Sequence, residues 1–507
     1  MRRLDTNEIQ ILERNRCFCE DWTKILVSDD FNAIHIRNSN FYGYVMIGKG
    51  VKISDTRMIK GSGKPAKPNI ISVLNEGGDG NVILCHQLTA QLAWLMMKSK
   101  CVMDMVRREV ESDLEKLGNR QWTVIGDYTV IEGASRIEDS EIGDWRLEIG
   151  DVELEMGKRD AAVYIGNDVV VHQSVIVGGA ELTDGAKVYE SFVGEAVHIG
   201  KGFSSEASLF FANAYMDNGE SCAAVLGPFA CSHHKSTLLI GGEFSFYNAG
   251  SNTNQSNHAY KMGPIHWGTL QRGAKTASGC HILWPATIGM FSMVMGKLTQ
   301  HPNLENLPFS YVFANPEKTY IYPGINMATV GTWRDINKWP KRDARAKSSR
   351  RDIITFDFPN PLVKQYAEKG IETLRQLAQE QGDNADEYRY QSCFIKNRAL
   401  HRGLEYYELL LSICDKSWEG EYVDVLGCII SKEDKDEIVR DVAAGKICDS
   451  ETLISRINEV QVSGSRVQDS EAMTKWKEMI ADDARKEFAM GDVEESQLDD
   501  FLELLNS

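Results

Sequence analysis

The sequence predicts a mainly β protein: a parallel β-helix with a long α-helix inserted into it, followed by an α-helical C-terminal domain. Three observations carry this prediction. An aliphatic residue recurs at every sixth position in several stretches before residue 205, an amphipathic helical pattern interrupts them, and helical periodicity dominates after residue 360. A period of six matches neither an α-helix nor a single flat strand, and it is typical of a β-solenoid with three short faces per coil.

The six-residue register identifies the core of the rod. Its clearest members are three triplets, Ile47, Ile53 and Ile59; Ile125, Ile131 and Ile137; and Ile165, Val171 and Val177. Val193, Ile199 and Ser205 continue the register more weakly, and a glycine often follows the aliphatic residue. One aliphatic side chain per face would point into a narrow core, and each coil would add one strand spacing of about 4.8 Å. We expect the rod to occupy residues 40–335, with its repeats between about 40 and 300.

Residues 1–39 are expected to form an N-terminal helical segment, in which Asp5 or Thr6 caps a short helix that extends to Cys19. A second helix is predicted as an insertion at 86–118. Its apolar residues are spaced by threes and fours, the pattern is broken only at Ser99, and Gly118 ends it. Because the repeats resume afterwards, we interpret this helix as an insertion into one rod, packed on its side.

The remaining chain divides into a basic linker at 336–359 and an α-helical domain at 360–507. The linker holds seven cations: Lys338, Lys341, Arg342, Arg345, Lys347, Arg350 and Arg351. It is either a solvated connection or a clamp for a phosphorylated ligand. Asn360 and Pro361 form an N-cap and N1 pair. Helices are predicted at about 361–380, 393–415, 432–444, 450–460 and 470–489.

Composition excludes several classes of function. The 507 residues are 42% hydrophobic and carry a net charge of −17, which argues against general binding of nucleic acid. No apolar run approaches the roughly 20 residues of a membrane span, and the N-terminus has no apolar segment of a signal peptide. The 11 cysteines are scattered, with no CxxC pair. We therefore expect a cytoplasmic protein without a membrane span.

The candidate site lies between Cys231 and His301. Six of the 11 histidines fall in this stretch, namely His233, His234, His258, His266, His281 and His301. A polar run from Asn248 to His258 interrupts the repeats, and its amides would be costly to bury in an apolar core without partners. We therefore expect this stretch to line a cleft.

The isoleucine-glycine repeats, over residues about 40 to 300, resemble those of the hexapeptide-repeat proteins, whose rods are left-handed parallel β-helices. The segments LERNRCFCEDW, SVLNEGGDGNV and TVGTWRDINKWPKRD are also similar to those of a large uncharacterised bacterial family. The hexapeptide resemblance implies an acyltransferase that uses acyl-CoA and forms a homotrimer with clefts between neighbouring rods. A histidine as general base, and a sugar or nucleotide sugar as acceptor, are further implications of that resemblance.

The sequence offers the groups that acyl transfer needs. His258, directly after Asn257, is the first candidate for the base, and His234 in the segment SHHKS is the second. Candidates for holding the substrate are Asn252, Asn254, Asn257, Lys261, His266 and His281. Candidates for holding the phosphates of acyl-CoA are Arg272, Lys275, Lys341, Arg342 and Arg345.

Two alternatives use the same residues. A γ-carbonic-anhydrase-like enzyme would bind zinc through three of His234, His258, His266 and His281. No pair of these histidines shows the close spacing typical of ligands, and amides are poor zinc ligands, so no metal is expected. The other alternative is a non-enzymatic scaffold or ligand-binding rod. An acyltransferase acting on an amino or hydroxyl group is the preferred interpretation.

Overall fold

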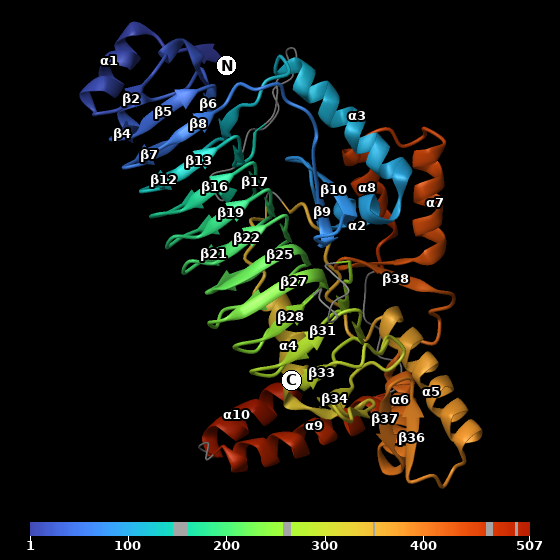
Figure 1. Cartoon of the computed structure of the whole chain (residues 1–507). Helices are drawn as coiled ribbons and strands as arrows, with labels where there is room; N and C mark the ends of the chain where they lie inside the picture. The colour runs from blue at the N-terminus through green and yellow to red at the C-terminus, as the bar shows by residue number, and fades with distance from the viewer. Residues whose placement is uncertain (146–160, 257–264, 348–349, 463–469, 492–494, 507) are drawn as a thin grey trace.

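The computed structural model describes residues 1–145, 161–256, 265–347, 350–462, 470–491 and 495–506. The protein is mainly β, with many parallel strands and a helical C-terminal region. Short strands stack along a rod, and their colours follow the sequence from one end to the other (Figure 1). Within the regular part, Val171 pairs in register with Val188, 17 residues later, so each coil contributes one rung to each face.

Three faces of parallel strands surround the core. The first face contains β3 (Ile25–Val27), β6 (Val45–Ile47), β11 (Thr123–Ile125), β14 (Glu141–Ile142), β17 (Val175–Ile176), β20 (Phe192–Val193), β23 (Leu209–Phe210), β29 (Thr269–Leu270) and β32 (Thr287–Ile288). The second contains β4 (Ile36–Arg37), β7 (Lys52–Ser54), β12 (Val130–Glu132), β15 (Tyr164–Ile165), β18 (Glu181–Leu182), β21 (His198–Gly200), β24 (Tyr215–Asp217), β26 (Cys231–Ser232), β30 (Lys275–Thr276), β33 (Met293–Leu298) and β34 (Tyr311–Ala314). The third contains β2 (Phe18–Cys19), β5 (Asn40–Gly43), β8 (Ile59–Gly61), β13 (Arg136–Glu138), β16 (Val170–His172), β19 (Lys187–Tyr189), β22 (Ser204–Glu206), β28 (Asn254–Ser256) and β31 (His281–Leu283). Two longer strands, β25 (Gly219–Leu226) and β27 (Thr237–Phe244), run from the third face into the first.

The aliphatic residues of the six-residue register are buried. Ten of them belong to the rod core: Ile47, Ile53, Ile59, Ile125, Ile131, Ile137, Ile165, Val171, Val193 and Ile199. Val177 is also buried, but it belongs to a second apolar cluster outside the rod, and its neighbour Ile176 takes the core position opposite Ile142. The register therefore shifts by one residue at this rung.

The parallel coils begin earlier than residue 40, because β2 pairs with β5 and β3 pairs with β6. The N-terminal helix α1 spans Thr6–Arg14, and Asp5 caps it in a capping box with Glu8. The strand β1 (Arg2–Arg3) pairs antiparallel with β3. The segment from 15 to 39 is therefore part of the rod rather than a continuation of the helix.

The insertion contains a hairpin and two helices. The hairpin is β9 (Asn69–Asn75) with β10 (Asp79–Leu84), and the helices are α2 (Ala90–Lys98) and α3 (Lys100–Lys116). The single helix expected at 86–118 is broken at Ser99, whose ψ of 116° lies outside the helical region. The apolar stripe packs against rod residues such as Phe192 and Leu209, and against α7 (Lys432–Ala443) and α8 (Ser450–Val460).

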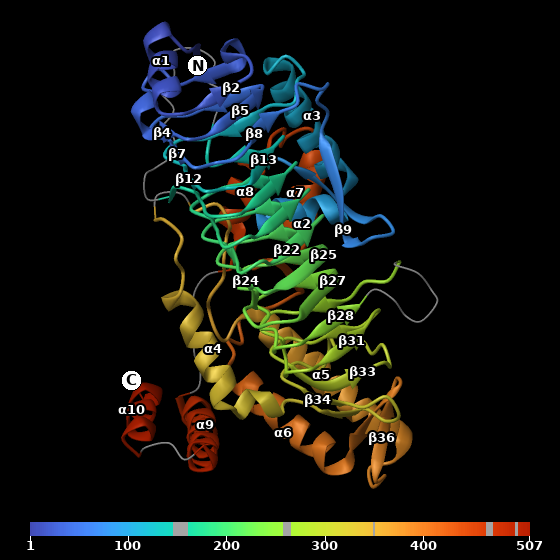
Figure 2. The same cartoon turned by 60° about the vertical axis from the view of Figure 1, so that its left-hand side comes forward.

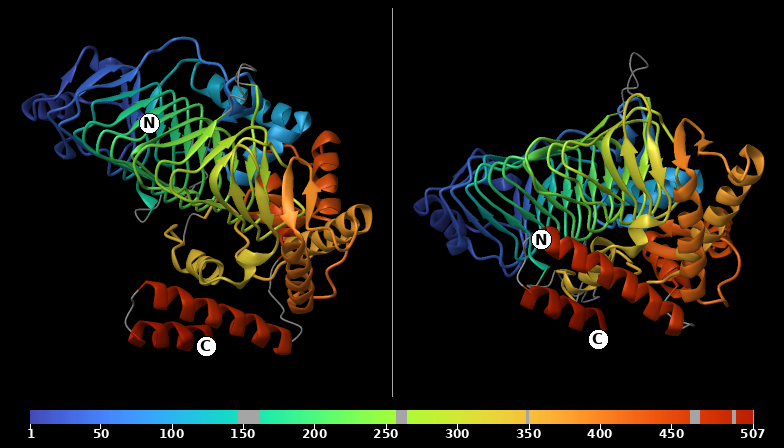
Figure 3. Two further views of the ribbon diagram at one scale, coloured as in Figure 1. Left: turned by 60° about the horizontal axis from the view of Figure 1, so that its bottom comes forward. Right: turned by 90° about the horizontal axis from the view of Figure 1, so that it is seen from below.

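The C-terminal region consists of helices and two hairpins that the helical pattern did not predict. α5 (Pro361–Gln381), α6 (Asn397–Ile413) and the hairpin β36 (Glu387–Tyr390)–β37 (Cys393–Lys396) lie at the end of the rod, where β37 joins β35 (Tyr320–Tyr322). The hairpin β38 (Tyr422–Val425)–β39 (Cys428–Ser431) and α7 and α8 lie beside the insertion (Figure 1). α9 (Ser470–Met490) and α10 (Glu495–Asn506) run antiparallel beside the end of the rod (Figure 3).

The expected basic linker begins as a helix, α4 (Val330–Lys341), which lies along one side of the rod (Figure 2). We call residues 343–347 and 350–358, which follow it, the strap. The strap contacts an edge of the rod formed by four phenylalanines with left-handed backbone, Phe229, Phe246, Phe291 and Phe309. Phe356 meets Phe229, and Phe358 meets Phe291 and Phe309, edge to face. These contacts compensate for a conformation that costs non-glycine residues free energy.

Candidate functional site

A cavity of about 220 Å³ lies where the rod, the insertion and the C-terminal region meet. Its walls come from β27 and β29, from the rod edge after them, from the end of α2, from α5 and from β38. Its polar residues are Lys98, Glu243, Ser245, Thr269, Gln271, Arg272, Glu305, Tyr366, Tyr422 and Asp424. Because these residues are far apart in sequence, the cavity exists only in the folded chain.

Glu243, at the end of β27, is the group in this cavity with the most altered acidity. Burial raises the pKa of its carboxyl group to about 7, Asp424 raises it further, and the nearby ammonium of Lys98 opposes the shift. No described residue donates a hydrogen bond to this carboxyl group. A carboxyl with a pKa near neutrality can both accept and return a proton at physiological pH.

Lys98, the last residue of α2, keeps an exposed ammonium group at the cavity. The group lies 5.9 Å from the ring centre of Trp94 and 5.3 Å from that of Trp267. Two indole faces hold the cation by cation–π attraction. No described carboxylate forms an ion pair with it, so its charge remains available to a ligand.

Arg272 is the other cation of the cavity, and its guanidinium group is hydrogen-bonded to other parts of the protein. Its Nε donates to Asp424 Oδ2, and its two terminal nitrogens donate to the carbonyls of Thr355 and Gly427, each at 2.8 Å. Its guanidinium lies 4.3 Å from the ring centre of Phe246. Arg272 was expected to hold the phosphates of acyl-CoA. In the structure it joins the rod to the strap and to the β38–β39 hairpin.

Two further polar atoms in the cavity wall have no hydrogen-bond partner in the described part of the chain. They are Ser245 Oγ and Gln271 Oε1, both inaccessible to solvent. The Gln271 amide nitrogen lies 3.3 Å from Glu305 Oε1, and the Tyr366 hydroxyl donates to the same oxygen at 2.9 Å. Buried polar atoms are rarely left unpaired in folded proteins. A bound molecule with hydroxyl or amine groups would satisfy them only after a side-chain movement brings the two atoms to the cavity surface.

The first-choice base, His258, lies outside the described residues, as do Asn257 and Lys261. The second choice, His234, is exposed in the turn after β26. Its ring lies 4.1 Å from that of His233, whose Nδ1 is 3.1 Å from Cys231 Sγ. Burial raises the pKa of Cys231 to about 11, while Lys338 and Arg342 oppose the shift. His233, His234 and the end of α4 are therefore neighbours on a different face from the cavity.

Of the other predicted substrate residues, Asn252, Asn254 and His281 lie on the third face or near its turns, and His266 lies near the first face. Asn254 pairs in register with His281, which in turn pairs with Lys297, whereas Asn252 occupies an exposed turn with a φ of 57°. Burial and Lys297 lower the pKa of His281. His266 is half-buried shortly before β29. None of these four residues lines the cavity, although His266 directly precedes Trp267, whose ring contacts Lys98.

The predicted phosphate ligands also separate. Lys275 pairs with Asp335, and Arg345 is buried and pairs with Asp343 at 2.9 Å. Lys341 and Arg342 are exposed at the end of α4. Of the five cations chosen from the sequence, these two keep the accessibility that a phosphorylated ligand needs. All five remain predictions as ligands.

Glu243, Lys98, Gln271 and Ser245 were missed because no local pattern marks them. Glu243 sits in the segment GGEF, where a single outward-facing glutamate resembles any solvated residue of a strand. What alters its acidity is the approach of α2 and β38, which are more than 140 residues away on either side. The only signal in the sequence was the interruption of the six-residue register near this point.

Within the described residues, no three histidine, cysteine, aspartate or glutamate side chains are grouped so that they could hold a metal ion. His234, His266 and His281 are not brought together. None of the helices among the described residues combines the length and the apolar character that a membrane crossing requires.

A model of the family described as "Domain of unknown function (DUF4954)" matches residues 1–67 and 46–378. The chain belongs to this family. No curated protein matches it. The match covers the rod, the insertion, α4 and the strap, and it ends within α5. The β38–β39 hairpin, which completes the cavity, lies beyond it.

Three solved structures show a distant likeness to this member of the DUF4954 family. A UDP-N-acetylglucosamine acyltransferase of Francisella novicida is 11% identical with a TM-score of 0.21, covering 76% of this chain and 94% of its own. A putative acetyltransferase of Desulfovibrio desulfuricans is 10% identical with a TM-score of 0.15, covering 62% and 72%. A UDP-N-acetylglucosamine O-acyltransferase of Moraxella catarrhalis is 9% identical with a TM-score of 0.12, covering 72% and 90%. Scores this low carry neither fold nor activity over to this chain.

Proposed function

We propose that this protein is an acyltransferase whose acceptor binds in the cavity, with Glu243 as general base. The observation that supports this most is the Glu243 carboxyl group, which has a pKa of about 7 and no hydrogen-bond donor among the described residues. Ser245 Oγ and Gln271 Oε1 have no hydrogen-bond partner among the described residues, and a side-chain movement would bring them to the hydroxyl or amine groups of an acceptor. The hexapeptide-like register supports the choice of acyl transfer as the reaction.

The proposed reaction needs one proton relay. Glu243 takes the proton from an acceptor hydroxyl or amine while the acceptor oxygen or nitrogen attacks the carbonyl carbon of acyl-CoA. The new bond to the acyl carbon forms, the thioester C–S bond breaks, and Glu243 returns the proton to the leaving thiolate of CoA. Lys98, the cavity cation without a carboxylate partner among the described residues, faces the oxyanion.

The cavity volume suits a sugar-sized acceptor, and a nucleotide sugar would place only its sugar there. The donor is acyl-CoA, whose extended chain would pass from the cavity around the rod edge so that its phosphates meet Lys341 and Arg342 on the neighbouring face. No metal takes part in this mechanism. The coils wind left-handed and the protein assembles as a homotrimer, as the resemblance to the hexapeptide-repeat proteins implies. An experimental structure and light scattering test these two points separately from the reaction.

Release of CoA thiol tests the reaction, with acetyl-CoA as donor and glucose, glucosamine and UDP-N-acetylglucosamine as probe acceptors. Glu243→Gln should lower turnover by about 10²–10⁴-fold, the range for loss of a general base. The matched control is Glu220→Gln, an exposed glutamate on β25, which should leave turnover unchanged. If His258→Ala abolishes turnover while Glu243→Gln does not, the base is His258 and the cavity assignment is wrong.

A ligand-binding role without catalysis is the second candidate. It is favoured because four separate parts of the chain enclose the cavity, so a ligand would hold the insertion and the C-terminal region against the rod. In that case one of the probe acceptors would raise the unfolding temperature of the wild type, but no CoA thiol would be released. Thiol release with any probe would exclude this candidate.

A further inference from the structure

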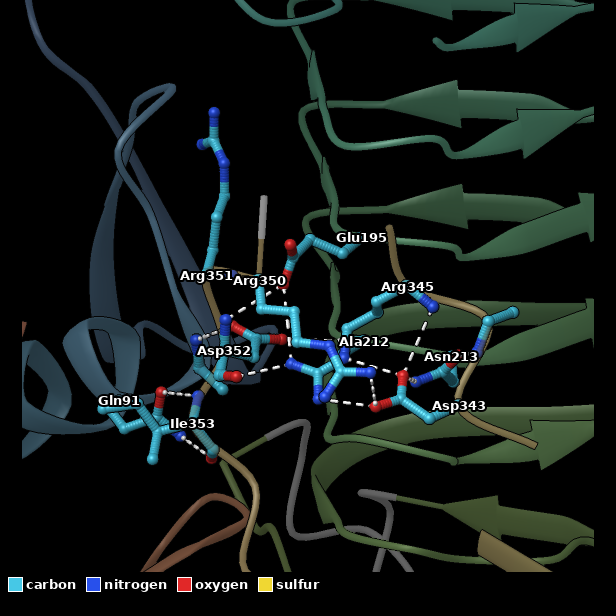
Figure 4. Close-up of polar contacts among 12 residues, drawn as sticks. Gln91, Glu195, Ala212, Asn213, Asp343, Arg345, Arg350, Arg351, Asp352 and Ile353 are labelled. Carbon is cyan, nitrogen blue, oxygen red and sulfur yellow. Dashed lines mark hydrogen bonds and ion pairs between the residues drawn. The ribbon is translucent and has the colours of Figure 1, made fainter. Parts of the chain in front are cut away.

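The strap is held to the rod by two buried carboxyl groups, Glu195 and Asp352. Glu195 lies at the rod edge, and its Oε2 accepts hydrogen bonds from the backbone N–H groups of Arg351 at 2.8 Å and Asp352 at 3.0 Å (Figure 4). Its other oxygen, Oε1, is buried and has no hydrogen-bond partner among the residues that the structure describes. A buried, charged carboxylate oxygen without a donor costs much more free energy than a neutral, protonated one.

Asp352 joins the strap to two other parts of the chain. Its Oδ1 accepts from the N–H of Ala90, the first residue of α2, at 2.8 Å, and its Oδ2 accepts from the N–H of Ala212 on the rod at 2.9 Å. Ionised Asp352 therefore caps α2 while binding the rod. A negative charge at a helix N-terminus is favourable.

Few positive charges face this pair. From the strap, Arg345 Nη1 lies 3.8 Å from Glu195 Oε2, but Arg345 also binds Asp343, as does Arg350. The Arg351 side chain turns to Asp144 on the rod, at 2.8 Å. Burial, and then the charge of Asp352, raise the pKa of Glu195 to about 7, and burial raises that of Asp352. Two adjacent buried carboxyls cannot both ionise cheaply.

The strap connects this pair to the cavity. The Ile353 N–H donates to Gln91 Oε1 at 3.0 Å, and the Gln91 amide donates to the carbonyls of Ile353, Val425 and Leu426. Two residues further on, the Thr355 carbonyl accepts from Arg272, and its N–H donates to Gly427. The segment from Asp352 to Thr355 thus binds α2, the rod edge and the β38–β39 hairpin, which are three walls of the cavity.

We propose that Glu195 and Asp352 are positioning residues of a proton-dependent clasp. With one proton on Glu195, the strap holds α2 and the β38–β39 hairpin against the rod. Loss of that proton places two negative charges side by side, loosens the strap and lowers the affinity of the cavity for its ligand. The effect on the ligand rests on the proposed function, whereas the effect on the strap does not.

Hydrogen exchange of the full chain tests the clasp without a ligand. After correction for the intrinsic pH dependence, amides of Ala90–Leu92 and Leu426–Ile429 should exchange about tenfold faster at about pH 8.5 than at about pH 6. Glu195→Gln, which mimics the protonated acid, should show slow exchange at both. The control Glu220→Gln should behave like the wild type. Equal wild-type exchange at the two pH values would overturn the clasp.

A second variant keeps the test decisive if Glu195→Gln does not fold. Asp343→Asn frees Arg345 to stabilise ionised Glu195, so the exchange transition should move to lower pH. A transition that stays in place or moves upward would contradict the assignment. Affinity for glucosamine, measured in a Glu243→Gln background to remove the cavity's own titration, should fall across the same transition. If glucosamine does not bind but the pH transition in hydrogen exchange is still observed, the proposed function is contradicted and the clasp is not.

Discussion

Arg272 and Asp424 are 152 positions apart in the sequence, yet Arg272 Nε donates to Asp424 Oδ2 at 2.8 Å. The pair joins the rod to the β38–β39 hairpin at the wall of the cavity. Arg272 is almost completely buried, and Asp424 is partly exposed. The contribution of this ion pair to the free energy of unfolding can therefore be compared with that of an ion pair on the surface.

Arg272→Met should destabilise the chain by about 3–5 kcal/mol, because it removes the donor of Asp424 Oδ2 and of the Thr355 carbonyl, and one of the two donors of the Gly427 carbonyl. The measurement is denaturant-induced unfolding. The control is Lys432→Met, which removes a pair with Glu421 on the exposed surface and should cost less than about 1 kcal/mol. Equal costs for the two variants would mean that the buried pair does not hold the hairpin.

Ile131→Asp should destabilise the rod by more than about 4 kcal/mol, because it places an unpaired charge between Ile53 and Ile165 in a narrow core. Val130→Asp is the matched control, since Val130 is half-buried on the outer side of the same strand. Circular dichroism and denaturant unfolding compare the two. A mild effect of Ile131→Asp would be incompatible with the register of the core.

Stability should fall as the pH rises from about 4.5 to about 7. Burial raises the pKa values of Glu141, Glu195 and Glu243 to about 7 in the folded chain, so this state binds more protons than the unfolded chain in that window. The contribution of each carboxyl group to stability is fully present below its pKa in the unfolded chain. It is lost as the pH rises through its pKa in the folded chain. Urea unfolding at several pH values measures this, and Glu141→Gln should reduce the slope. A slope that Glu141→Gln leaves unchanged would contradict the shift of Glu141.

Lys98→Met should raise the pKa of Glu243, because it removes the positive charge that favours the ionised carboxylate. Carbon NMR of the labelled glutamate carboxyl groups follows this titration without any substrate. Lys100→Met, at an exposed position just beyond the end of α2, is the control and should leave the titration in place. An unchanged Glu243 titration in Lys98→Met would show that the Lys98 ammonium group does not act on the Glu243 carboxyl group.

Charge reversal at Lys341 and Arg342 should weaken binding of acetyl-CoA and flatten its dependence on salt, because both side chains are exposed near the proposed donor site. Isothermal titration at two ionic strengths measures both effects. Arg402→Glu with Lys416→Glu makes the same change of charge on exposed residues of the C-terminal region and should have little effect. If the two double variants behave alike, only net charge matters.

The sequence predicted those parts of the fold that depend on neighbours along the chain. Ile125, Ile131 and Ile137 could be placed in the core because each side chain repeats the role of the one before it. The helix from Pro361 could be placed because its cap, Asn360, precedes it directly. Two hairpins in the C-terminal region escaped, because four-residue strands between helices carry too little periodicity to detect.

The cavity could not be predicted in the same way. Glu243, Lys98 and Asp424 gain their properties from one another, and nothing in the sequence shows that α2 and β38 meet on the same face of the rod. Arg272 was selected as a cation near the histidine-rich stretch. Its partners, Thr355, Gly427 and Asp424, are set by the strap and the hairpin.

The path of the strap has a consequence for dividing the protein into fragments. Residues between α4 and α5 have the composition of a connector, and a cut between two fragments would naturally be placed there. Yet this segment covers the phenylalanine edge, caps α2 and binds the β38–β39 hairpin. A rod produced without it would expose stacked aromatic rings to water, and a C-terminal fragment would lose the partner of Asp424. We expect the two fragments to fold only when they are expressed together.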